Sequence, residues 1–97
     1  MNKTYTYMAS LCWRGLLGGW LVIDDERVTY HTGKLQVPAE IRELSMPFCR
    51  ITGVERSKLA FLPTVTIRLQ NGREWQLLVF GRGGFLRRLE TAMAAYG

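Results

Sequence analysis

The strongest constraint on the fold of this chain is an alternating pattern that a single turn interrupts. Apolar residues occupy every second position over residues 65–69 and again over residues 75–79, with Asn71-Gly72 between them. A period of two places alternate side chains on one face of a β-strand, and Asn-Gly is a strong turn signal. The segment therefore predicts an antiparallel hairpin with one apolar face.

The register of this hairpin follows from keeping its apolar residues together. A two-residue loop would place Trp75 on the face opposite Ile67 and divide the apolar set. A three-residue loop over residues 70–72 pairs Ile67 with Trp75. Such a loop requires a left-handed residue and a bulge, so Gly72 is expected at positive φ. The same register pairs Val65 with Leu77 and Arg68 with Glu74.

An earlier segment predicts a second hairpin. Leu21 and Ile23 alternate before the polar turn at residues 24–27, and Val28 and Tyr30 alternate after it. A four-residue loop pairs Ile23 with Val28 and Leu21 with Tyr30, which puts all four side chains on one face.

Three further strands are expected. Residues 5–14 predict a first strand that ends before a glycine, and residues 54–58 predict a short one. Residues 44–48 alternate through Pro47, which favours an edge strand because proline donates no backbone hydrogen bond. The conformation of residues 35–44 stays open, since a helical turn starting at Pro38 competes with extended chain.

The C-terminal segment predicts one amphipathic helix, from about Phe85 to Tyr96. Its apolar residues recur every three or four positions and form a stripe that can pack on the sheet. The stripe consists of Phe85, Leu86, Leu89, Ala92, Met93 and Tyr96. Residues 81–84, which are rich in glycine, are expected to form a flexible turn. A phosphate-binding loop is the weaker interpretation, because the Lys-Ser/Thr of a P-loop is missing.

Size and composition indicate one domain over residues 1–97. The chain is 47% hydrophobic and 22% charged, which is typical of a globular protein, and its formal net charge is +5. Its most apolar stretch, residues 11–23, contains Arg14 and is too short for a membrane helix. The N-terminus lacks the features of a signal peptide, so a cytoplasmic location is expected.

The sequence predicts neither an enzyme nor a metal or cofactor site. His31 is the single histidine, and neither Cys12 nor Cys49 has a histidine at a useful spacing for nucleophilic catalysis. Zinc needs three or four converging ligands, which one histidine and two distant cysteines do not suggest. Both cysteines are expected to be buried, reduced thiols within strands.

Two segments carry a resemblance to a known family. These are Gly19-Trp20-Leu21-Val22-Ile23-Asp24-Asp25-Glu26-Arg27-Val28-Thr29-Tyr30 and Met46-Pro47-Phe48-Cys49-Arg50-Ile51-Thr52-Gly53-Val54-Glu55. They resemble the opening hairpin and the apolar-Pro-apolar strand of GRAM and bacterial pleckstrin-homology-like domains. The resemblance implies a mainly β fold: a partly open barrel of about seven antiparallel strands, capped by the C-terminal helix.

The resemblance also implies a noncatalytic adaptor, whose partner is an unknown protein or an anionic membrane surface at the inner face of the cell membrane. In that family the first hairpin loop, here residues 14–19, often holds lipid headgroups. Only Arg14 is basic there, so contact through apolar loops flanked by basic residues is the alternative to a headgroup pocket. The candidate residues are Arg14, Leu16, Leu17, Arg56, Lys58, Leu59, Phe61 and Leu62. Apolar residues in loops more often fold inward, and that outcome stays open.

Two other functions remain as alternatives. An edge strand over residues 44–48 could pair across a two-fold axis and form a homodimer. The basic charge and Trp13, Trp20 and Trp75 are compatible with nucleic-acid binding, but no named binding motif is present. Tryptophans at strand spacing are more typical of a core.

Overall fold

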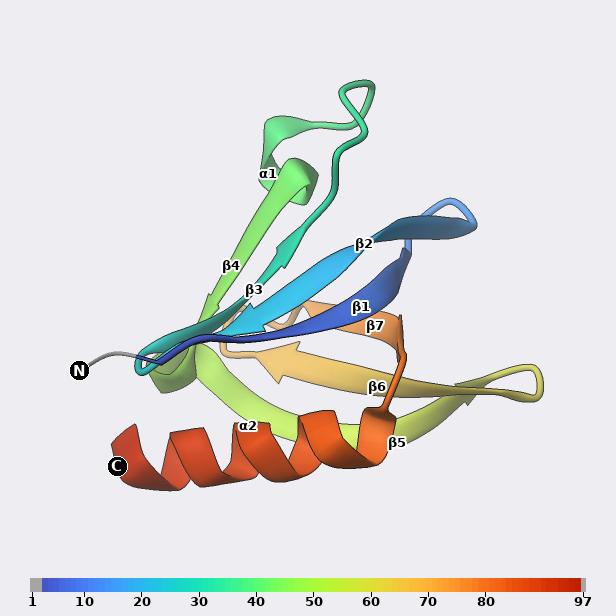
Figure 1. Cartoon of the computed structure of the whole chain (residues 1–97). Coiled ribbons are helices and arrows are strands. Elements are labelled where there is room, and N and C mark those ends of the chain that lie inside the picture. The colour runs from blue at the N-terminus through green and yellow to red at the C-terminus, as the bar shows by residue number, and fades with distance from the viewer. Residues whose placement is uncertain (1–2, 97) are drawn as a thin grey trace.

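The computed structural model describes residues 3–96, which form one curled, half-barrel sheet with a long helix along its open side (Figure 1). The strands are β1 (Tyr5–Cys12), β2 (Leu16–Ile23), β3 (Arg27–His31), β4 (Glu43–Pro47), β5 (Ile51–Leu59), β6 (Leu62–Leu69) and β7 (Glu74–Val79). The helices are α1 (Ala39–Arg42) and α2 (Arg82–Tyr96), and a 3-10 turn covers Phe48–Arg50. The prediction of seven antiparallel strands and one C-terminal helix is confirmed.

The sheet order is β4-β3-β2-β1-β7-β6-β5, and every pairing is antiparallel. Strands that are neighbours in sequence pair with each other except across the β4 to β5 connection. The β1–β7 pair joins a first half, β1 to β4, to a second half, β5 to β7. β4 and β5 are therefore the two edges of the sheet, as expected for the segment that contains Pro47.

Both predicted hairpin registers are confirmed. Ile67 pairs with Trp75, and Gly72 has φ +85°, as the bulged loop requires. In the first hairpin Ile23 pairs with Val28, and a side-chain oxygen of Asp24 accepts hydrogen bonds from the backbone of the turn. Apolar alternation thus fixed the strand pairing because a one-residue slip would expose half of the core.

The core fills the concave side of the sheet. Alternate residues of every strand except β5 supply it, together with the inward face of α2. The buried residues are Ala9, Leu11, Leu21, Ile23, Val28, Tyr30, Leu44, Met46, Val65, Ile67, Leu77, Val79, Phe85 and Leu89. Phe85 packs edge-on against Tyr7, with ring centroids 5.4 Å apart. α2 contacts β2, β6 and β7, so it holds the two halves of the sheet together.

The β1–β2 loop is shorter than expected. β2 begins at Leu16, so Gly18 and Gly19 lie inside a strand rather than in a loop over residues 14–19. Gly19 is required there because an added Cβ would overlap the Tyr30 ring and the backbone of the neighbouring strand. The Tyr30 hydroxyl donates to the Leu17 carbonyl oxygen at 2.5 Å, which ties the start of β2 to β3.

Three other boundaries differ from the sequence prediction. β5 runs on to Leu59, and the expected apolar loop is a tight turn at Ala60, which has φ +55°. α2 begins at Arg82, so only Gly81, at φ +77°, forms the turn before it. The open segment at residues 38–44 contains the single helical turn α1. In each case backbone hydrogen bonding continues a regular element further than side-chain periodicity indicates.

The prediction that both cysteines are buried in strands is wrong. Cys12 ends β1 and is half-buried, and partial burial raises the pKa of its thiol. Cys49 lies in the 3-10 turn after β4 and is exposed. Its position in a strand was expected because Phe48 continues the alternation, but the chain turns there to cross toward β5. Within residues 3–96, no helix has the length and hydropathy to cross a bilayer.

Candidate functional site

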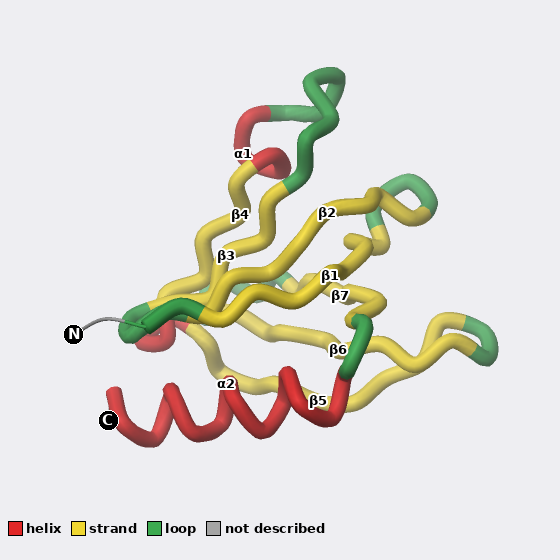
Figure 2. The backbone as a smooth tube through the Cα atoms, in the orientation of Figure 1, coloured by secondary structure: helices red, strands yellow, loops and turns green. Residues whose placement is uncertain are grey.

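Three connections of the sheet present large apolar side chains to solvent. The β1–β2 and β3–β4 loops leave one end of the first half of the sheet, because β1 to β4 are antiparallel neighbours, and the β5–β6 turn projects from the second half (Figure 2). Each contributes an exposed residue: Leu16 is 49% exposed, Leu35 79% and Phe61 88%. We call these three loops together the loop end. Three separate loops with the same unusual feature distinguish it from a scatter of single apolar residues.

The β5–β6 hairpin forms the most prominent tip of the loop end. Lys58 pairs with Pro63 and Leu59 with Leu62, which leaves only Ala60 and Phe61 in the turn. The tight turn leaves Phe61 no room to fold back onto the core. Leu62 is half-buried. The expectation that apolar turn residues fold inward is therefore wrong at Phe61.

A second tip lies between β1 and β2. Arg14 has φ +52°, and its guanidinium lies 4.8 Å from the centre of the Trp13 ring. This cation–π contact holds a positive charge beside the exposed Leu16. Leu17 is half-buried and packs against the core, so it is not part of the exposed tip.

The charges at the loop end have one sign. Residues 13–16, 32–38 and 58–63 include Arg14, Lys34 and Lys58, and they contain no aspartate or glutamate. The acidic turn after β2, Asp24 to Glu26, lies at the other end of β2 from the β1–β2 loop. Of the eight predicted residues, Arg14, Leu16, Arg56, Lys58, Leu59 and Phe61 are exposed, and Leu17 and Leu62 are half-buried. The structure adds Lys34 and Leu35, of which Leu35 lies in the segment whose conformation the sequence left open.

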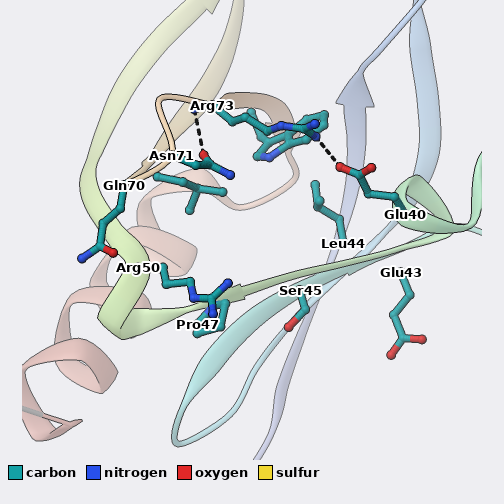
Figure 3. Close-up of a pocket in the computed structure, with 11 residues that line it drawn as sticks. Glu40, Glu43, Leu44, Ser45, Pro47, Arg50, Gln70, Asn71 and Arg73 are labelled. Carbon is teal, nitrogen blue, oxygen red and sulfur yellow. Dashed lines mark hydrogen bonds and ion pairs between the residues drawn. The ribbon is translucent and has the colours of Figure 1, made fainter.

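A separate cavity lies between β4 with α1 and the β6–β7 loop (Figure 3). Its volume is ≈ 700 Å³, and an ion pair between Glu40 and Arg73 spans it. The indole nitrogen of Trp75 is buried beside it without a hydrogen-bond partner. Glu40, Glu43 and Ser45 supply polar side chains to the cavity, and the Arg27 guanidinium donates a hydrogen bond to the Ser45 hydroxyl at 3.0 Å. The cavity therefore offers polar groups for binding.

A narrower groove runs between β5 and α2. It has a volume of ≈ 550 Å³, and Ile51, Val54, Leu86, Leu89 and Met93 supply its apolar lining. The outer edge of β5 has no strand partner, so its backbone could accept an extended segment. The groove also carries charges of both signs, from Glu55, Arg56, Arg87 and Glu90. It therefore lacks the single charge sign of the loop end.

No protein-family model matches the sequence, and none of the curated proteins matches it either. Among solved structures, the C-terminal domain of an unknown protein from Leishmania infantum is similar, with a TM-score of 0.77 and 12% sequence identity. The match covers 93% of this chain and 82% of that chain. A likeness at this identity shows a shared fold and carries no functional information.

Proposed function

We propose that this chain is a noncatalytic module that binds an anionic membrane surface through its loop end. The observation that carries the proposal is the 88% exposure of Phe61 at the tip of a hairpin whose nearest charged neighbours on β5, Lys58 and Arg56, are basic. The two other loops repeat the combination of an exposed leucine and a basic residue. The resemblance to GRAM and bacterial pleckstrin-homology-like domains supports the same interpretation.

The physical chemistry of an interface favours this arrangement. Each large side chain that enters the bilayer interface contributes about 1–2 kcal/mol, and each nearby Lys or Arg about 1 kcal/mol on anionic lipid. Acidic side chains on the same surface would oppose the attraction, and these loop segments have none. Loop tips that enter the interface only partly give weak and reversible binding, which depends on salt because charge supplies much of it.

Sedimentation with lipid vesicles tests the proposal. Wild type is expected to sediment with vesicles that contain phosphatidylserine and to remain in solution with phosphatidylcholine alone. Phe61→Ser should lower the partition coefficient about 5- to 30-fold, the equivalent of 1–2 kcal/mol. The matched control is Phe80→Ser, because Phe80 is an exposed aromatic residue on the outer face of the sheet rather than on a loop tip.

The outcomes separate the two partner classes. An equal fall in the partition coefficient of Phe61→Ser and Phe80→Ser would show that general hydrophobicity drives sedimentation. The loop end would then not be the binding surface. If wild type fails to sediment with either vesicle type, the membrane proposal is wrong and a protein partner becomes the better interpretation.

A further inference from the structure

A row of mostly apolar side chains crosses the outer face of the sheet from the end of β7 to β3. Met8 pairs with Trp20 and Trp20 pairs with His31, and the Phe80 amide donates to the Met8 carbonyl oxygen at 3.0 Å. These four residues thus lie side by side across β7, β1, β2 and β3. Phe80 is 62% exposed, Met8 57% and Trp20 37%. The Trp20 and His31 rings stack at 5.6 Å, which makes a flat aromatic surface.

This outer face has almost no charge. The eight residues of β1 and the eight of β2 include no Asp, Glu, Lys or Arg. Charged side chains begin only at its border, with Arg27 on β3 and Glu43 on β4. The side chains on the face, in alternation with the core residues, are Thr6, Met8, Ser10, Cys12, Leu16, Trp20, Val22, Thr29 and His31. An uncharged apolar strip of this kind is typical of a surface that another protein covers.

We propose that a second copy of this chain covers this face, which we call the uncharged face. Two molecules that each carry a net charge of +5 repel one another, and they can meet most closely where neither presents a charge. An apolar row on one copy matches the same row on another under a two-fold axis. Two sheets packed face to face are a common arrangement of apolar sheet surfaces.

Charge also argues against the other occupants. Anionic lipid is attracted by basic side chains, and the uncharged face has none to offer. A strongly charged partner would lose hydration there without gaining an ion pair. The helix α2 packs on the concave side of the sheet, so it does not cover this face. This inference does not rest on the membrane proposal, because its central residues, Met8, Trp20 and Phe80, are not part of the loop end, and the two surfaces share only Leu16 at their border.

The size of the uncharged face predicts a weak dimer. Eight-residue strands are about 27 Å long and four strands span about 19 Å, so the footprint is roughly 500 Å². A standard stable interface buries about 800 Å² on each partner. We therefore expect a dimer that dissociates on dilution rather than a permanent one.

Sedimentation equilibrium over a wide range of protein concentration tests the inference. Wild type is expected to shift from monomer toward dimer as its concentration rises. Met8→Lys places one positive charge on each copy in the middle of the interface and should weaken the association at least about tenfold. Met8 is exposed, so the variant should fold, which circular dichroism checks. Phe61→Lys adds the same charge at the loop end and should associate as wild type does.

Several results would overturn the inference. If wild type stays monomeric at every concentration, the proposed dimer does not form. If Met8→Lys associates as tightly as wild type, the contact lies on another surface, such as the β4 edge. The same holds if Phe61→Lys weakens the association as much as Met8→Lys does. Loss of vesicle binding by Met8→Lys in a monomeric protein would assign the uncharged face to lipid instead.

Discussion

The two halves of the sheet have similar inner faces and very different outer faces. In the second half, Arg68 contacts Glu74 and Glu55, each at 2.7 Å, in a line across β7, β6 and β5. The first half presents the Met8, Trp20 and His31 row instead, which Phe80 extends just after the end of β7. Both patterns alternate correctly with the core, so folding alone does not require the difference. The second half has a surface suited to water, and the first half has one suited to burial.

The polar groups of the second half also satisfy one another. The Ser57 hydroxyl lies 2.7 Å from that of Thr64 and 2.8 Å from that of Thr66, and the Gln76 amide donates to Thr64 at 2.8 Å. The hydrogen bond from Arg68 to Glu74, with the charge of Glu55, raises the pKa of the Arg68 guanidinium. Because these groups are already paired, this face offers few free donors and acceptors to a partner.

The largest expected effect comes from the helix that bridges the halves. Leu89→Ala should lower the free energy of unfolding by about 2–4 kcal/mol, because it leaves a cavity where α2 packs on the sheet. Urea denaturation measures the change. The control is Glu90→Ala, which alters an exposed neighbour on the same helix and should have little effect. If Leu89→Ala were as stable as wild type, the helix could not be what holds the two halves together.

The next largest effect on stability is expected from a substitution at Gly19, which tests the packing of the first half of the sheet. Gly19→Ala should cost about 1–3 kcal/mol, since its Cβ would meet the Tyr30 ring and the backbone of β3, and the strands must shift. Gly18→Ala is the matched control, because an added Cβ there meets nothing within 4 Å. Equal thermal midpoints for the two variants would contradict the close approach of Tyr30 to β2.

A substitution in the β6–β7 turn, in the second half of the sheet, should lower the stability less. Gly72 has φ +85°, a conformation that costs a residue with a Cβ about 1 kcal/mol. Gly72→Ala should lower the urea midpoint accordingly. Gly33→Ala, at a loop glycine with open surroundings, should leave it nearly unchanged. An unchanged midpoint in Gly72→Ala would refute the bulged loop.

The smallest effect is expected from the ion pairs of the second half. Arg68→Gln removes both contacts, but all three side chains are about half exposed, so solvent and salt screen the interaction. The melting temperature should fall slightly at low ionic strength and match wild type at high ionic strength. A loss that persists in concentrated salt would mean that Arg68 stabilises the sheet through packing rather than charge.

Local sequence patterns determined the strand pairing but not the exposure of the loops. Ile67 and Trp75 had to share a face, and only one loop length allowed it. Phe61 offered no such test, because an apolar residue near a turn is compatible with either burial or exposure. Its exposure depends on β5 and β6 remaining paired up to Leu59 and Leu62, which side-chain periodicity does not report.

The loop end and the uncharged face both depend on relations between distant segments. Leu16, Leu35 and Phe61 are far apart in sequence, and only the folded chain shows that all three side chains are exposed. Phe80 and Met8 become neighbours only when β7 pairs with β1. The sequence by itself determined the elements, the core residues and two registers, because each follows from periodicity within a short window. The tertiary structure alone decided which surfaces exist, because a surface depends on which strands lie side by side.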